Sequence, residues 1–131
     1  MGLISPRLMP CQGPEMRYSK AAVSSPASIA NFGPGFDSFG LCLDTPRDLV
    51  TMRCAAAGTR QVRVTGRTAV PTDPLKNTAS YAAMKLAESC GHEDFGFSMT
   101  IKKGMKPGSG IGSSAASSVG GALAAATLLG V

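Results

Sequence analysis

The sequence predicts an α+β fold, and the order of its hydrophobic patterns is the main reason. Short runs that alternate apolar and polar residues indicate strands, and two longer runs with apolar residues at helical spacing indicate helices. In chain order the pattern reads strand, loop, three strands, helix, strand, loop and helix. Strands followed by interleaved helices favour an α+β sandwich over a doubly wound parallel sheet.

The first four strands are expected in the N-terminal half, at residues 18–29, 41–43, 49–54 and 61–65. Pro26 favours a sheet edge or a strand end, because proline cannot donate to a strand ladder. Three glycines and a proline at 31–40 predict a defined loop rather than a helix, and Ala57-Gly58 is a turn signal.

The C-terminal half reads as helix, strand, loop and helix. Ala79 to Cys90 has apolar residues at helical spacing, and Gly91 would end that helix. Residues 95–103 alternate as a strand, 103–112 form a glycine-rich loop, and 113–129 form an Ala-rich helix that is apolar almost all round.

Composition narrows the class of protein. The 131 residues are 44% hydrophobic, which is enough for one folded domain. The net charge is +5, but the basic residues are scattered and aromatics are few, so no nucleic-acid partner is expected. No apolar run approaches the roughly 20 residues that span a bilayer, so no membrane association is expected either.

The N-terminal residues 1–17 are expected to be a disordered extension or a misassigned start, since Met16 lies just ahead of the first patterned segment. They lack the continuous apolar core of a secretory signal. A cytoplasmic location is expected, and a plastid location stays open because this stretch contains only one acid, Glu15.

The run from Lys106 to Ala116, KPGSGIGSSAA, is the most informative stretch. Glycines let a backbone approach phosphate oxygens closely, and the start of the following helix carries unpaired N–H groups and a partial positive charge. Ser113 or Ser114 can cap the helix, bind a phosphate oxygen, or offer a hydroxyl to Mg²⁺. The alternative is a glycine-rich connection ahead of a core helix.

The more common phosphate motifs do not fit this loop. A P-loop needs Lys directly after its last glycine, whereas Gly112 is followed by Ser113. A dinucleotide fingerprint opens a βαβ unit, whereas this loop follows the sixth predicted element and has no acidic residue downstream.

Two motifs carry a family resemblance. Gly110-Ile-Gly-Ser-Ser-Ala-Ala resembles the phosphate loop of the GHMP small-molecule kinases, and residues 26–41, PASIANFGPGFDSFGL, resemble the N-terminal signature of homoserine kinases. The resemblance implies the two-layer N-terminal domain of that superfamily, which is similar to the second domain of a ribosomal small-subunit protein. Residues 18–131 would form this ATP-binding domain, truncated at its C-terminal end.

The resemblance also implies site residues. Asn31 and Asp37 would contact L-homoserine, Asn77 would reach the adenosine, and Ser114 would supply a hydroxyl to Mg²⁺. The ATP phosphates would be wrapped by Lys106, Pro107, Gly108, Ser109, Gly110, Ile111, Gly112, Ser113, Ser114, Ala115 and Ala116. Many family members have Pro at the position of Lys106. No general base is assigned.

The implied reaction converts ATP and L-homoserine to ADP and O-phospho-L-homoserine, in threonine biosynthesis. Because relatives are more than twice as long, this stretch is expected to bind nucleotide without turning over. Two alternatives stay open: another GHMP kinase acting on mevalonate, shikimate or a sugar, and a non-catalytic nucleotide- or RNA-binding module of the same fold. A homodimer stays open as well. In the simpler alternative, Asn31 and Asp37 would serve only to shape the turn.

Overall fold

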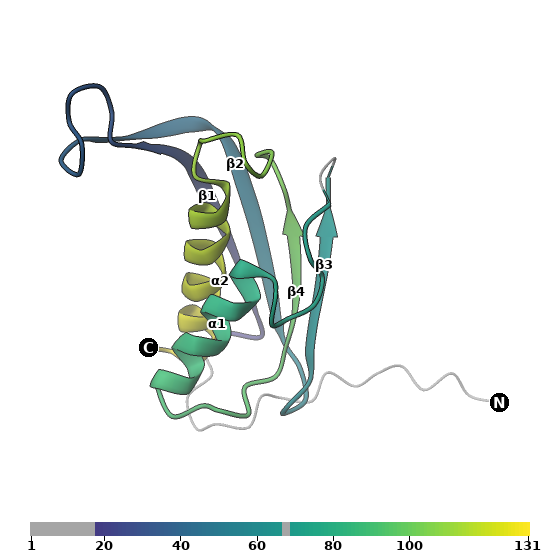
Figure 1. Ribbon diagram of the computed structural model, residues 1–131. Helices are drawn as coiled ribbons and strands as arrows, with labels where there is room; N and C mark the ends of the chain where they lie inside the picture. The colour runs from purple at the N-terminus through teal and green to yellow at the C-terminus, as the bar shows by residue number, and fades with distance from the viewer. Residues whose placement is uncertain (1–17, 67–68) are drawn as a thin grey trace.

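Four strands form one mixed sheet, and two helices cover one of its faces (Figure 1). The structure is a computed structural model that describes residues 18–66 and 69–131. The expected extension at 1–17 lies outside the described residues. The elements are β1 (Lys20–Ala30), β2 (Gly40–Cys54), β3 (Arg60–Thr65), α1 (Thr78–Ser89), β4 (Phe97–Lys102) and α2 (Ser113–Leu129).

The sheet has the strand order β1-β2-β4-β3. β1 and β4 both pair antiparallel with β2, and β3 pairs parallel with β4. β1 therefore lies at an edge, where its Pro26 is tolerated, and its register with β2 shifts between Pro26 and Ser28. β3 does not pair with β2, although the two are consecutive in sequence, because β4 lies between them.

The predicted two-layer α+β class is confirmed, with one correction to the strands. Residues 41–43 and 49–54 were expected as two strands, but they are the two ends of β2. Residues 43–46 between them have no partner in the β1–β2 register, which passes from Cys42 opposite Ser28 to Arg47 opposite Pro26 across an irregularity. Such a bulge interrupts the period of two, so the side-chain pattern suggests two strands where the backbone forms one.

The main core lies between the sheet and the helices. Every second residue of β2 from Asp48 to Cys54 is buried, and the residues between them are more exposed. Phe97, Met99 and Ile101 of β4 lie in the same layer, as the alternation predicts. α2 packs against both the sheet and α1, and a Cβ added at Gly121 would lie 2.0 Å from the Ala79 carbonyl oxygen of α1. Glycine thus permits the close contact of the two helices.

A second, smaller core cluster lies under the loop between β4 and α2. It consists of Ala27, Met105 and Ala116, with Leu43 and Ile111 packed against it. These residues come from β1, β2, the loop and α2, so apolar contacts attach the loop to the hairpin that β1 and β2 form.

The outer face of α1 is polar. Lys85 Nζ lies 2.6 Å from Glu88 Oε2, and this hydrogen bond lowers the pKa of Glu88 from its usual value. Neither of the two described helices is long and apolar enough to cross a membrane.

Candidate functional site

The predicted glycine-rich loop joins β4 to α2, and left-handed glycines shape it. Gly108, Gly110 and Gly112 have φ values of 77°, 79° and 74°. A Cβ added at Gly108 or Gly110 would meet nothing within 4 Å, so their backbone conformation alone favours glycine. At Gly112 an added Cβ would also lie 2.5 Å from Ser28 Oγ of β1. The loop therefore rests against β1 at the point where the helix begins.

The start of α2 has no side-chain cap, which corrects one of the roles considered for Ser113 and Ser114. The N-cap residue is Gly112, in a left-handed conformation and without a side chain to accept from the first turn. Ser113 is buried and Ser114 is exposed, each already inside the helix. The first-turn amides thus face outward without a capping oxygen, which is the arrangement that binds anions.

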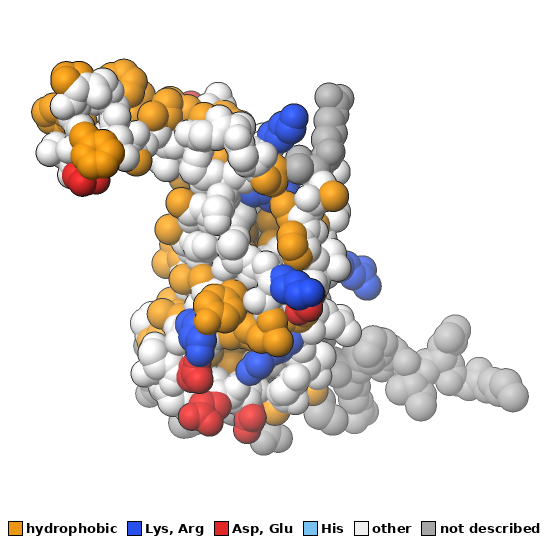
Figure 2. Space-filling model, in the orientation of Figure 1, with side chains coloured by type: hydrophobic (Ala, Val, Ile, Leu, Met, Phe, Trp, Pro, Cys, Tyr) orange, Lys and Arg blue, Asp and Glu red, His pale blue; other side chains and the backbone are white. Residues whose placement is uncertain are grey.

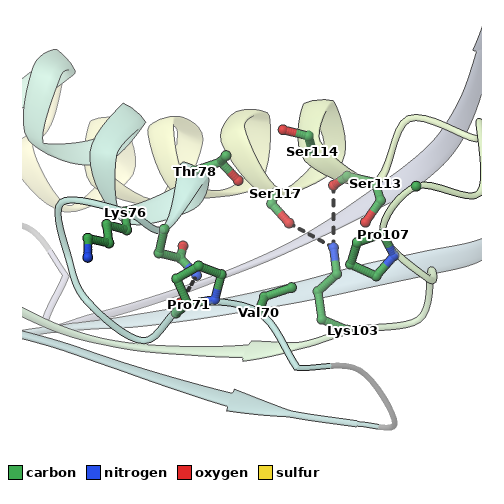
Figure 3. Close-up of a pocket in the computed structure, with 11 residues that line it drawn as sticks. Val70, Pro71, Lys76, Thr78, Lys103, Pro107, Ser113, Ser114 and Ser117 are labelled. Carbon is green, nitrogen blue, oxygen red and sulfur yellow. Dashed lines mark hydrogen bonds between the residues drawn. The ribbon is translucent and has the colours of Figure 1, made fainter.

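A pocket of about 170 Å³ opens beside this helix start (Figure 3). Three stretches line it: the segment before α1, the end of β4 with its loop, and the first two turns of α2. The lining residues are Val70, Pro71, Lys76, Asn77, Thr78, Lys103, Pro107, Gly108, Ser113, Ser114 and Ser117. The structure therefore brings together five residues predicted from sequence, namely Asn77, Pro107, Gly108, Ser113 and Ser114.

Asn77 lies in this lining, but its side chain also caps α1. Its Oδ1 accepts from the amides of Ala79 and Ser80, at 3.1 and 3.3 Å. Its Nδ2 donates to the Pro71 carbonyl oxygen at 2.8 Å. The residue is only 4% exposed, so the cap accounts for Asn at this position without a ligand. The adenosine contact stays a prediction.

The other predicted loop residues do not line the pocket. Lys106, Ser109, Gly110 and Ala115 are exposed. Ile111 and Ala116 instead contribute to the small core cluster under the loop. The side chains of Ile111 and Ala116 thus have a structural role, and the amides of Ser109 and Ala116 already donate to the carbonyl oxygens of Lys106 and Gly112. The predicted phosphate contacts of these residues stay predictions.

Beneath the pocket lies a buried polar cluster that the sequence analysis missed, made of Asp48, Lys103 and Ser117. Asp48 forms an ion pair with Lys103, and both side chains are almost fully buried. Ser117 Oγ lies 2.9 Å from Lys103 Nζ and 3.2 Å from Asp48 Oδ2. The alternation of buried residues could have pointed to this cluster. Asp48 continues the buried face of β2, and Lys103 continues that of β4.

Asn31 and Asp37, predicted to bind substrate, lie at the tip of the β1–β2 hairpin and not in the pocket (Figure 1). Asn31 Oδ1 accepts the Asp37 amide at 2.7 Å, and both residues are left-handed, with φ of 55° and 57°. These features show that the pair shapes the turn. Its contact with a substrate stays a prediction.

The hairpin tip also exposes hydrophobic side chains. Phe32, Phe36 and Phe39 are 55%, 75% and 63% exposed. Figure 2 shows hydrophobic side chains gathered on this projecting tip. One backbone hydrogen bond connects the base of the hairpin to the glycine-rich loop, from the Ser28 amide to the Ile111 carbonyl oxygen at 3.0 Å.

The predicted metal ligand, Ser114, is exposed at the edge of the pocket. Within 18–66 and 69–131, no group of three or more His, Cys, Asp or Glu side chains could hold a metal ion. Mg²⁺ commonly binds through one or two protein oxygens together with substrate phosphates. The residues present therefore fit a nucleotide-borne Mg²⁺ rather than an all-protein metal site.

Comparisons with known proteins agree with this geometry. The family profile "GHMP kinases N terminal domain" matches residues 77–131. Homoserine kinases of Pyrococcus furiosus and Thermococcus gammatolerans are 47% and 49% identical to this chain, over 83% and 80% of its length. The aligned region is 36% and 34% of those proteins, so the chain spans about a third of the curated relatives it matches.

Solved structures show the same fold. The crystal structure of a homoserine kinase from Cytophaga hutchinsonii is similar over 90% of this chain and 38% of that one, with a TM-score of 0.75 and 36% identity. A mevalonate kinase of Methanococcus jannaschii reaches a TM-score of 0.60 over 84% of this chain and 40% of its own, at 15% identity, which shows a shared fold alone. The chain belongs to the GHMP kinases, and its residues 77–131 match their N-terminal domain.

Proposed function

We propose that this chain forms the ATP-binding part of a homoserine kinase, which transfers a phosphoryl group from ATP to L-homoserine and yields ADP and O-phospho-L-homoserine, in threonine biosynthesis. The observation that carries the proposal is the uncapped start of α2, preceded by three left-handed glycines and open to the pocket. The choice of homoserine is supported by relatives of that name at 43–49% identity.

The loop would hold the ATP phosphates through its backbone. Amides between Gly108 and Ala115 would donate to phosphate oxygens, except that of Ser109, which already donates to the Lys106 carbonyl oxygen. The positive end of the α2 dipole adds a favourable field. Lys106 is an exposed residue of the loop and would add a cation near the phosphates. In phosphoryl transfer, positioning and charge stabilisation supply most of the catalysis, which suits a site without an assigned base.

Ser114 would hold Mg²⁺ through its hydroxyl, with ATP phosphates as further ligands. When bound, the ion would neutralise charge on the phosphates. The neighbouring Ser113 is buried, so Ser114 is the better placed of the two hydroxyls.

Asn31 and Asp37 would recognise the amino-acid end of homoserine. Asp37 is exposed, and its carboxylate can accept from an ammonium group. Asn31 uses its side-chain oxygen within the turn, which leaves its NH₂ to donate to a substrate carboxylate.

Calorimetric titration of the 131-residue chain tests this proposal. We expect ATP with Mg²⁺ to bind, and Ser114→Ala to weaken binding with Mg²⁺ more than binding in EDTA. Ser118→Ala is the matched control, because this half-buried serine of α2 lies outside the pocket lining. Failure of ATP to bind, or equal losses for both variants, would reject the site.

A coupled assay of ADP release then tests the reaction. Homoserine-dependent ADP release by the 131 residues would contradict the expectation that this stretch binds nucleotide without turning over. ADP release by a longer relative with mevalonate or shikimate but not with homoserine would replace the proposed substrate. Binding of RNA that falls steeply with salt, in place of ATP binding, would favour the non-catalytic module.

The location and the partners of the protein are proposals as well. We place the protein in the cytoplasm, without a nucleic-acid or membrane partner, and leave a homodimer open.

A further inference from the structure

The carboxylate of Asp48 connects β2 to both ends of the glycine-rich loop. Its Oδ1 accepts from the amides of Gly104 and Met105, at 2.9 and 3.2 Å, where the loop leaves β4. Its Oδ2 accepts from Ser117 Oγ, at 3.2 Å, where α2 begins its second turn. Asp48 is 0% exposed, so water does not compete for these bonds.

Lys103 completes the connection from the other side. Its ammonium group donates to Asp48 Oδ2. It also donates to Ser117 Oγ at 2.9 Å and to the carbonyl oxygen of Ser113 at 3.3 Å, as Figure 3 shows. A lysine has three N–H donors, and protein oxygens take all three. Although Lys103 lines the pocket, it therefore has no donor left for a phosphate, and its influence on a bound nucleotide must pass through Ser113 and Ser117.

These contacts fix the distance and direction between the start of the loop and the first turn of α2. The amides proposed to hold phosphate lie between those two points, and small displacements of positioned groups can lower binding or rate strongly. We propose that Asp48 and Lys103 are positioning residues that hold the glycine-rich loop in its phosphate-binding shape, with Ser117 as the link to α2. This inference rests on the proposed function, because it assigns a task to residues beneath the same site.

The test compares two buried serines that differ in one respect. Ser117 belongs to the cluster, whereas Ser25 lies opposite Asp48 on β1, is 3% exposed, and has a hydroxyl without a hydrogen-bond partner among the described residues. Ser117→Ala removes one link from the cluster, and Ser25→Ala removes a hydroxyl of the same size and burial without touching the link. Titrations of the 131-residue chain with ATP and with adenosine give the two affinities.

We expect Ser117→Ala to weaken ATP binding by about tenfold and adenosine binding by less than about twofold, because only the phosphates depend on the loop. Ser25→Ala should change neither. The double variant Asp48→Leu with Lys103→Met, which replaces the pair by apolar side chains of similar shape, should still unfold cooperatively yet lose more ATP affinity than Ser117→Ala. Equal losses for ATP and adenosine, or no loss with either variant, would overturn the inference.

Hydrogen exchange separates this inference from the proposed function. If the unaltered chain binds neither ATP nor adenosine, the proposed function fails, and the exchange of the Gly104 and Met105 amides still tests the cluster. Faster exchange in Ser117→Ala than in Ser25→Ala supports the positioning role. Equal exchange in the two variants contradicts it.

Discussion

The two glycine-rich loops of this chain differ in what fixes their shape. The loop at 103–112 rests on the body of the domain, held by Asp48 from β2 and by Ser28 from β1. The tip at 31–39 projects from the helices and sheet, and its hydrogen bonds join its own residues (Figure 1). Both loops contain left-handed glycines, but contacts with distant residues fix the shape of the first loop and contacts among its own residues fix that of the second.

The two loops therefore differ in how far their shape is fixed before a ligand binds. A loop anchored to the core keeps its shape as long as the domain is folded, so it can present amides to a ligand without prior ordering. A projecting tip with few buried contacts opens at a lower free energy than the domain unfolds. Substitutions in the anchored loop should therefore change the free energy of global unfolding, whereas substitutions in the tip should change only local hydrogen exchange.

Asp48→Ala should have the largest effect, because it leaves the buried Lys103 ammonium and two loop amides without their acceptor. We expect a loss of about 4 kcal/mol in the free energy of unfolding, measured by urea denaturation. Asp44→Ala is the control, since Asp44 lies on the same strand with a fully exposed side chain near Arg47, and should cost less than about 0.5 kcal/mol. A loss at Asp48 below about 1 kcal/mol would mean that the loop is not anchored through it.

Gly112→Ala should come next, at about 2 kcal/mol, since it combines a left-handed backbone with a Cβ placed against Ser28 Oγ. Gly110→Ala has the same backbone requirement in open space and should cost about 1 kcal/mol. Urea denaturation of both variants isolates the contact with β1 as the difference between them. Equal losses would show that the contact with Ser28 relaxes freely.

Asn31→Ala should act on the tip alone. It places Ala at φ 55° and removes the acceptor of the Asp37 amide, at a local cost of about 1 kcal/mol. We expect faster hydrogen exchange at the Asp37 amide and an unchanged urea midpoint. Asn31→Gly, which tolerates the left-handed backbone but also loses the acceptor, should fall between the natural chain and Asn31→Ala. A midpoint shift as large as that of Gly112→Ala would remove the distinction between the loops.

Phe36→Ser should have the smallest effect on stability. This side chain is 75% exposed, so its replacement should change the free energy of unfolding by less than about 0.5 kcal/mol. Thermal unfolding followed by circular dichroism measures it, with the same substitution at the fully buried Phe97 as the contrasting case. A loss above about 1 kcal/mol at Phe36 would show that the tip packs against the domain.

The parts of the fold that follow local rules could be predicted from sequence. The two helices, β3, β4 and the loop ahead of α2 follow from periodicity and from glycine placement, and Asn77 precedes α1 as a capping residue would. The continuity of β2 could not be predicted, because residues 43–46 lie at an irregularity of the β1–β2 register, where the alternation of apolar and polar residues is interrupted. The insertion of β4 between β2 and β3 likewise depends on contacts between distant parts of the chain.

The site divides in the same way. Its backbone features could be predicted, since closely spaced glycines just before a helix favour a loop that leaves the first helical amides open. The cluster of Asp48, Lys103 and Ser117 could not, because its members lie 55 and 14 residues apart along the chain from Lys103, and each alone resembles a solvated polar residue. The only indication in the sequence was that Asp48 and Lys103 are charged at positions that the alternation assigns to the core.

The hydrogen bond from Ser28 to Ile111 has a consequence for transplanting this site. The motifs at 26–41 and 110–116 are far apart in sequence. Nevertheless, β1, which ends within the first motif, contacts the second through the amide and hydroxyl groups of Ser28. Grafting residues 104–116 alone onto another α+β sandwich would transfer the loop without the β1 residue that it contacts, Ser28. The smallest portable unit is the loop, its helix and the end of β1 together.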